Sequence, residues 1–140
     1  MIPVDLIHKD VITCKIDDSI LAVTKIMAEH SIGSIIVVED NKPVGIFTER
    51  DLLIRVVAAE KALDTTLVKD VMTSDLIVAT KGDSCASTYM KMKERHIRHL
   101  PVIDSHGALI GIISISDVIF RMNDILLTQS ASTEYFSGIY

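Results

Sequence analysis

The chain has 140 residues, of which 49% are hydrophobic and 4% aromatic, and its formal net charge is −5. This length suits one compact domain or two tightly joined small ones, and no apolar run approaches the roughly 18 residues that a membrane span needs. The acidic balance and the scarcity of aromatic side chains argue against a nucleic-acid binder. Because the first residues show no signal-peptide pattern, we expect a cytoplasmic protein with no membrane contact.

The first half of the chain predicts a strand, a helix, two further strands and a second helix. The first strand is expected at residues 11–16, and the helix after it has apolar side chains at helical spacing, at Ile20, Val23, Ile26 and Met27. Apolar runs at 34–38 and 44–47 flank a polar turn and predict a hairpin. Thr48 is expected to begin the second helix, and the polar residues 61–66 to link the two halves.

The second half predicts the same order of elements. Its expected elements are a strand at 76–80, a helix from Asp83–Ser84 to about Arg95, strands at 100–103 and 108–113, and a helix from Ser114. Runs such as 34–38 do not alternate with polar residues, so both faces of each sheet should be buried. The helices of one half can cover only one face. We therefore expect an α+β fold in which two β-α-β-β-α repeats pack sheet to sheet.

A seven-residue pattern near the end of each half shows that the halves are copies. Residues 45–51 (GIFTERD) and 111–117 (GIISISD) both have a glycine, two apolar residues, a hydroxyl, two variable residues and an aspartate. Ile32 matches Ile97 upstream at a shift of 65 residues. Residues 10–13 resemble 70–73 at a shift of only 60, which predicts about five extra residues before the second copy's first helix. Two copies are too few for an open solenoid, so we expect them to close on each other.

The hydroxyl and aspartate of each pattern allow two interpretations. Thr48 with Asp51, and Ser114 with Asp117, have the spacing of a capping box that satisfies the first free amides of a helix. Alternatively, a helix amino terminus attracts anions, and a hydroxyl and a carboxylate on one turn could hold a diol. The two roles can coexist, and the pattern leaves both open.

The duplicated pattern, after an apolar hairpin in each half, resembles a tandem pair of cystathionine-β-synthase (CBS) domains of the small stand-alone kind. Residues 48–51 (TERD) and 97–104 (IRHLPVID) are especially similar to that family. The resemblance implies a pseudo-twofold module with two clefts that bind adenine nucleotides or related adenosine ligands. It implies repeats at residues 7–62 and 67–123 and a C-terminal extension at 124–140.

Site residues follow from the resemblance, residue by residue. Asp51 and Asp117 would accept hydrogen bonds from ribose hydroxyls, and Thr48 and Ser114 would lie beside the ribose or phosphate. Family clefts are composite, so the site at the second pattern is expected to contain Lys15, Ile16, Ile32, Gly33, Ser34, Arg98, His99, Ser114 and Asp117. The site at the first pattern is expected to contain Ala79, Thr80, Ile97, Arg98, His99, Thr48, Arg50 and Asp51.

The two expected sites differ in charge. The second copy has Arg98 and His99 where the first has Gly33 and Ser34. Basic residues at these positions face ligand phosphates in the family, so the resemblance implies that the cleft with Ser114 and Asp117 is the better phosphate site. Arg50 is the candidate cation for the other cleft.

The resemblance implies a non-catalytic regulatory module that senses AMP, ADP or ATP, forms a homodimer and acts on a partner protein that the sequence does not identify. The alternatives are a scaffolding domain with vestigial clefts and a sensor of another adenosyl ligand such as S-adenosylmethionine. We expect no catalytic residues, since Walker A and GxGxxG patterns are missing from the sequence. We also expect no metal, because His96, His99 and His106 lack further ligands nearby. Cys14 and Cys85 lack CxxC spacing and are expected to be reduced thiols.

Overall fold

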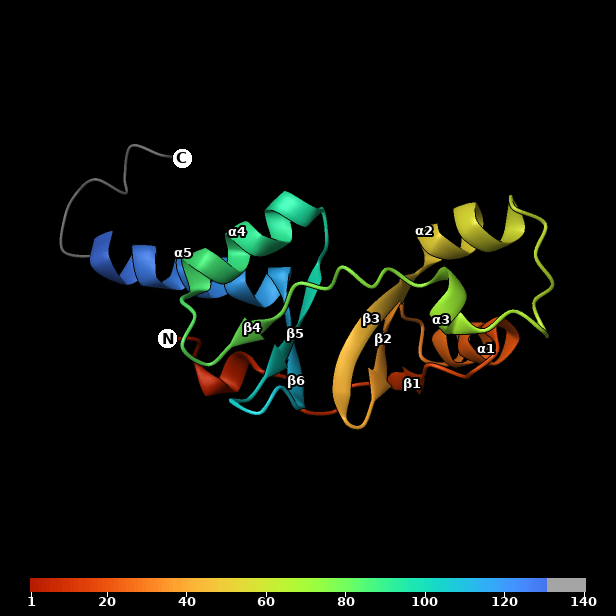
Figure 1. The fold of residues 1–140 in the computed structure, drawn as a ribbon. Coiled ribbons are helices and arrows are strands. Elements are labelled where there is room, and N and C mark those ends of the chain that lie inside the picture. Colours follow the sequence, from red (N-terminus) through yellow and green to blue (C-terminus); the bar gives the residue numbers. More distant parts are fainter. Residues whose placement is uncertain (131–140) are drawn as a thin grey trace.

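Two three-stranded sheets lie side by side in the computed structural model, which describes residues 1–130 (Figure 1). The first sheet has the order β1-β2-β3, formed by Thr13–Lys15, Ser34–Glu39 and Lys42–Thr48. The second has the order β4-β5-β6, formed by Ala79–Thr80, His99–Ile103 and Leu109–Ser114. In both sheets the first strand is parallel to the middle strand and the last is antiparallel to it. This shared topology confirms the predicted α+β fold with two repeats.

Helices complete each repeat. The first repeat has α1 (Ile20–Glu29), then α2 (Glu49–Asp51), which continues as a π-helix, η2 (Leu52–Val57), and α3 (Val68–Val71) precedes the second repeat. The second repeat has α4 (Cys85–Arg95) and α5 (Ile115–Ser130), and a short 3₁₀ helix, η1 (Val4–Leu6), lies near the amino terminus. Serine hydroxyls cap α1 and α4, as the sequence predicted, by accepting backbone N–H groups of the first turn.

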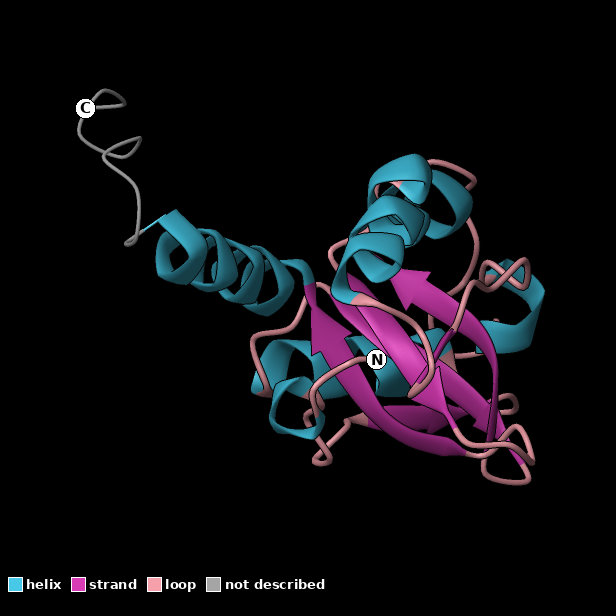
Figure 2. Ribbon diagram, turned by 90° about the vertical axis from the view of Figure 1, so that its left-hand side faces the viewer, coloured by secondary structure: helices cyan, strands magenta, loops and turns pink. Residues whose placement is uncertain are grey.

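The C-terminal extension predicted at residues 124–140 begins inside a helix. Helix α5 runs through residue 124 to Ser130, and its last turns extend beyond the body of the molecule (Figure 2). The apolar residues Tyr135, Phe136, Ile139 and Tyr140 of that extension lie outside the described residues. No helix within residues 1–130 has the length and apolar character to cross a membrane.

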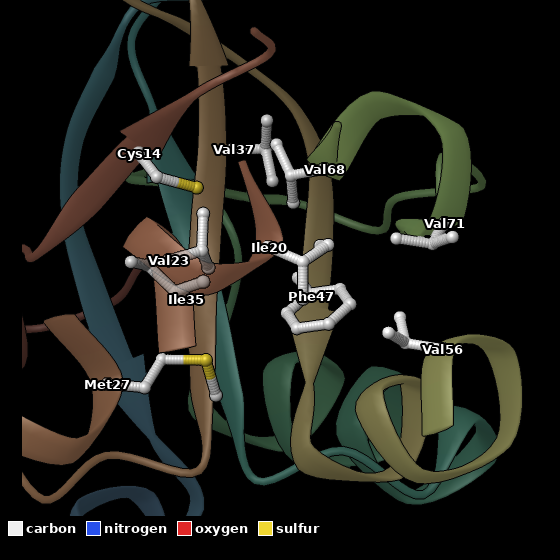
Figure 3. Close-up of a cluster of buried hydrophobic side chains, with 10 residues drawn as sticks. All are labelled: Cys14, Ile20, Val23, Met27, Ile35, Val37, Phe47, Val56, Val68 and Val71. Carbon is white, nitrogen blue, oxygen red and sulfur yellow. The ribbon is translucent and has the colours of Figure 1, made fainter. Parts of the chain in front are cut away.

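Each repeat has its own hydrophobic core, and each core takes in a segment from outside its repeat. The first core contains the fully buried Phe47, and Val68 and Val71 of α3 lie among its side chains (Figure 3). The second core is built around Met92, Leu100, Val102, Ile113 and Val118. It also contains Ile2, Leu6 and Ile7 from the start of the chain. Burial of these apolar side chains attaches the start of the chain to the second repeat and α3 to the first.

Main-chain pairing strengthens the same exchange. His8 pairs with Ile112 of β6 through two hydrogen bonds of 2.9 Å, and Thr73 pairs in the same way with Ile46 of β3. The motif glycines make room for these segments. A Cβ on Gly111 would lie 2.8 Å from the His8 carbonyl oxygen, closer than real Cβ atoms approach. A Cβ on Gly45 would likewise lie 3.0 Å from the Thr73 carbonyl oxygen, so both motif glycines admit close backbone approach.

The structure corrects the alignment of the two copies. His8 and Thr73 hold equivalent places and are 65 residues apart, the same shift that relates Ile32 to Ile97. The prediction that residues 10–13 match 70–73, with about five extra residues in the second copy, is wrong. A short resemblance in composition suggested that match, whereas strand pairing determines the true one.

The second face of each sheet is covered by the other sheet. Ile35 and Val37 of β2 point into the first core, so Ile36 between them points to the opposite face, yet it is only 1% exposed. Its cross-strand neighbour Ile46 is 7% exposed. The equivalent pair in the second sheet is the buried Pro101 and the half-buried Ile112. Burial on both faces is what the unbroken apolar strands predicted.

Candidate functional site

A cavity of about 680 Å³ lies between the repeats at the first seven-residue motif, and we call it the first-motif cleft. Its lining comes from both repeats. Of the residues predicted for this site, it brings together Thr48, Arg50, Asp51, Ile97, Arg98 and His99. Gly33 and Ser34, which were expected at the other site, also line it.

Asp51 lies at the first turn of α2 and is only 9% exposed. The Thr48 N–H donates to the Asp51 carboxylate at 3.1 Å, and the Asp51 N–H donates to the Thr48 hydroxyl at 3.1 Å. This is a complete capping box, so the capping interpretation is confirmed for the first motif. The Thr73 hydroxyl, 3.4 Å from Oδ1, and the Arg55 Nε, 3.6 Å from Oδ1, also face this carboxylate. A carboxylate has about four lone-pair positions, so capping leaves acceptor capacity for a ligand.

Positive charge in the first-motif cleft is only partly neutralised. Arg95 lines the cleft, but its Nη1 is 2.9 Å from the Asp75 carboxylate, which also lines it. Arg50 and Arg98 line the same cleft, and neither guanidinium has a hydrogen bond or ion pair with any residue in 1–130. Two unpaired guanidinium groups at one cavity favour an anionic ligand.

One wall of the cleft differs from the prediction. Ala79 is fully buried in the second core and does not line the cavity, and its contact with a ligand stays a prediction. Thr80 is not among the lining residues either, and its N–H donates to the Asp83 carboxylate. The wall is formed instead by the residues between α3 and β4, namely Thr73, Asp75, Leu76 and Ile77. The sequence prediction did not include them, because it began this strand at residue 76, whereas β4 begins at Ala79.

The second motif, residues 111–117, has a different arrangement. The Asp117 N–H donates to the Ser114 hydroxyl at 3.2 Å, but the Asp117 carboxylate turns to His8, whose Nε2 is 2.5 Å from Oδ2. This hydrogen bond lowers the pKa of Asp117 below its ordinary value. Burial lowers the pKa of His99, and Arg98 and His8 add to that effect, while Asp117 opposes it.

The structure disperses several residues that were predicted for the second site. Arg98 and His99, which were predicted for both sites, line the first-motif cleft, and His99 also interacts electrostatically with Asp117. Ile32 lines a smaller cavity of about 410 Å³ between α1 and α2. Lys15 is exposed on β1, and Ile16 packs against the first core. Ser114 and Asp117 line neither cavity. Within residues 1–130, no three histidine, cysteine or acidic side chains lie together as metal ligands would.

Comparison with known proteins adds a family to this geometry. The family model described as the CBS domain matches residues 4–58 and 68–124. A protein of Methanopyrus kandleri is 34% identical over 116 residues, and the alignment covers 82% of this chain but 59% of that protein. This chain therefore spans about three-fifths of the length of that relative.

Solved structures are similar over most of their length. A protein with CBS domains from Burkholderia ambifaria has a TM-score of 0.74 and 35% identity, with 82% of this chain and 84% of that chain covered. A CBS domain pair in complex with 5′-methylthioadenosine and S-adenosyl-L-methionine has a TM-score of 0.73 and 26% identity, with 86% of this chain and 94% of that chain covered.

Proposed function

Because this chain belongs to the CBS-domain family and contains two copies of the domain, we propose that it is a non-catalytic regulatory module that binds AMP, ADP or ATP in the first-motif cleft. The observation that carries this proposal is the composite cavity that joins the Asp51 carboxylate to the unpaired Arg50 and Arg98. Its volume of about 680 Å³ lies within the usual range for small-molecule sites.

The lining divides into parts that suit the three parts of a nucleotide. Ribose hydroxyls donate to the Asp51 carboxylate, since hydrogen bonds to an ionised acceptor are about twice as strong as neutral ones. Leu76, Ile77, Ile97 and Pro101 line the cleft and offer apolar contact for an adenine ring. Arg50 and Arg98 match phosphate oxygens in charge and fork geometry.

This proposal assigns the phosphate to a different cleft from the one that the sequence favoured. The sequence prediction gave the better phosphate site to Ser114 and Asp117, on the strength of Arg98 and His99. Both basic residues line the first-motif cleft, which is the reason for the change. S-adenosylmethionine has a cationic sulfonium, and unpaired guanidinium groups disfavour it there.

We also propose that the chain forms a homodimer through η2. Leu53, Ile54 and Val57 are 61%, 52% and 56% exposed, and clustered exposed apolar side chains are typical of protein contact surfaces. Sedimentation equilibrium tests this directly. A dimer that becomes a monomer in Leu53→Glu supports the proposal, and a wild-type monomer at tens of micromolar contradicts it.

Calorimetric titration with AMP, ATP, NADH and S-adenosylmethionine tests the binding proposal. We expect saturable binding of AMP or ATP, with a Kd on the order of micromolar, that Asp51→Ala abolishes and Asp64→Ala preserves. Asp64 is an exposed acid in the linker and serves as the matched control. Failure of all four ligands to bind would favour the scaffolding alternative, preference for S-adenosylmethionine would favour an adenosyl sensor, and turnover of nucleotide would contradict a non-catalytic role.

A further inference from the structure

Asp117, the acid of the second motif, is hydrogen-bonded to the amino-terminal segment of the same chain. His8 Nε2 lies 2.5 Å from Asp117 Oδ2, although the residues are 109 positions apart in sequence. At the first motif the equivalent place is held by Thr73, whose hydroxyl is 3.4 Å from the Asp51 carboxylate. The imidazole contact is much shorter than the hydroxyl contact. The two motifs therefore differ in the group that the crossing segment brings to the acid: an imidazole at Asp117 and a threonine hydroxyl at Asp51.

His8 is held in place by its neighbours as well as by Asp117. Its main chain pairs with Ile112 through two hydrogen bonds of 2.9 Å. Ile7, the residue before it, is part of the second core and is only 7% exposed. Asp5, three residues earlier, forms an ion pair with Arg121 of α5, the helix that also contains Asp117. The imidazole is thus presented to Asp117 by a well-anchored segment.

We propose that His8 closes the second motif to ribose, so that the protein takes up one adenine nucleotide, in the first-motif cleft, and not two. The inference rests on the proposed function for the identity of the ligand. Its physical basis is competition for one acceptor. A ribose hydroxyl is a neutral donor, and it must displace an imidazole that already donates to Asp117 from a fixed position. At the first motif the group from the crossing segment is the Thr73 hydroxyl at 3.4 Å, and the remaining donors, the Thr48 N–H and Arg55, leave acceptor capacity on Asp51.

Binding stoichiometry of the full chain tests the proposal. The variant is His8→Ala, since the His8 side chain is 57% exposed and its main-chain pairing does not need the ring. The control is His106→Ala, an exposed histidine in the turn between β5 and β6. By calorimetry with AMP we expect one site in the wild type and in His106→Ala, and two in His8→Ala. The second site should bind at least tenfold more tightly than any residual site of the wild type, and Asp117→Asn added to His8→Ala should remove it.

Two outcomes would overturn the proposal: a wild type that already binds two AMP molecules, or a His8→Ala protein that still binds one. A ligand-free measurement separates this failure from failure of the proposed function. By NMR titration of side-chain carboxyl carbons, His8→Ala should raise the pKa of Asp117 towards its ordinary value of 3.8. An unchanged Asp117 titration refutes the contact on which the inference stands. If neither protein binds AMP, the proposed function and the nucleotide count fail together, and the titration still decides whether His8 holds Asp117.

Discussion

The Thr73 hydroxyl lies 3.4 Å from the carboxylate of Asp51, although the two residues come from different copies of the repeat. Thr73 also pairs with Ile46 of β3 through two main-chain hydrogen bonds of 2.9 Å. The segment of the second repeat between α3 and β4 therefore runs directly past the acid of the first motif. A ligand bound at Asp51 as proposed would therefore contact the segment between α3 and β4. Such a contact can report occupancy only if the ligand binds two arrangements of the repeats unequally.

Replacing Asp51 by asparagine should separate ligand binding from folding. Asparagine has nearly the same shape and keeps an acceptor for the Thr48 N–H, so we expect a loss of stability below about 1 kcal/mol. The charge that strengthens hydrogen bonds from a ribose is lost, so affinity for AMP should fall about tenfold, which corresponds to about 1.4 kcal/mol. Calorimetry and urea unfolding measure the two effects, with Asp64→Asn as the control. Unchanged affinity in Asp51→Asn would show that ribose is not bound at this acid.

The unpaired arginines should act on the phosphate and not on the nucleoside. We expect Arg98→Ala and Arg50→Ala each to weaken ATP binding at least tenfold while affinity for adenosine changes less than threefold, because charge-assisted hydrogen bonds contribute roughly 1.5–3 kcal/mol. Arg95→Ala should have a smaller effect, since Asp75 already neutralises Arg95. Lys25→Ala, on the exposed face of α1, is the control for net charge. Equal losses for ATP and adenosine in Arg98→Ala would contradict a phosphate contact.

The strands and helices that form the repeats could largely be predicted from local sequence. The apolar runs at 34–38 and 100–103 became β2 and β5 with ends shifted by at most one residue, because a strand buried on both faces has an unbroken apolar sequence. The capping box of the first motif could also be predicted from local sequence, because the spacing of Thr48 and Asp51 indicated it. The π-helix at Leu52–Val57 was not predicted, because apolar periodicity alone does not distinguish it from an α-helix.

The crossing segments could not be predicted, and the errors in the site follow from them. Nothing in the local pattern of residues 2–7 or 68–71 indicates that each packs in the core of the other repeat. Their place is decided by apolar burial between distant parts of the chain. For this reason the sequence prediction did not include His8 and Asp75 among the site residues. The 65-residue shift that relates Ile32 to Ile97 also relates His8 to Thr73. Applying that shift to the whole first half would have been the usable signal.

Among the glycines of residues 1–130, Gly111 should be the most sensitive to replacement by alanine. An added Cβ would lie 2.4 Å from Ile7 Cγ2 and 2.8 Å from the His8 carbonyl oxygen, so the anchored amino-terminal segment would have to move. Overpacking of this kind costs about 1–3 kcal/mol. Gly82→Ala is the control, because its nearest neighbour would be 3.8 Å away. Urea unfolding compares them, and equal stability of the two variants would show that the segment is not held as the structure describes.

The two cysteines should differ sharply in reactivity. Burial, with a smaller effect of Asp18, raises the pKa of Cys14 to about 12, so its thiol stays protonated and inaccessible at neutral pH. Cys85 begins α4 and is partly exposed. In a thiol assay we expect one reactive group per folded chain and two after unfolding in urea. Cys85→Ser should leave the folded protein almost unreactive, and rapid labelling of that variant would contradict the burial of Cys14.

The free energy of unfolding should contain a component that His99 controls between pH 7 and 5. Burial lowers the pKa of His99 below its ordinary value of 6.5, and the neighbouring Arg98 and His8 lower it further. The unfolded chain therefore takes up this proton at a higher pH than the folded chain does. A group with a depressed folded pKa stabilises the protein above its unfolded pKa, and that stabilisation is lost as the pH falls below about 6.5.

Replacing His99 by glutamine, which is polar and does not titrate, should remove this component. Urea unfolding of the wild type and of His99→Gln at half-unit steps from pH 8 to 5 gives the difference, in which contributions of titrating groups that do not interact with His99 cancel. We expect the wild type to lose more stability than the variant as the pH falls. His106→Gln, in an exposed turn, should follow the wild type. If the free energy of unfolding of the wild type and of His99→Gln fell in parallel with pH, the pKa of His99 would be the same in the folded and unfolded chains. That result would contradict the effect of burial beside Arg98.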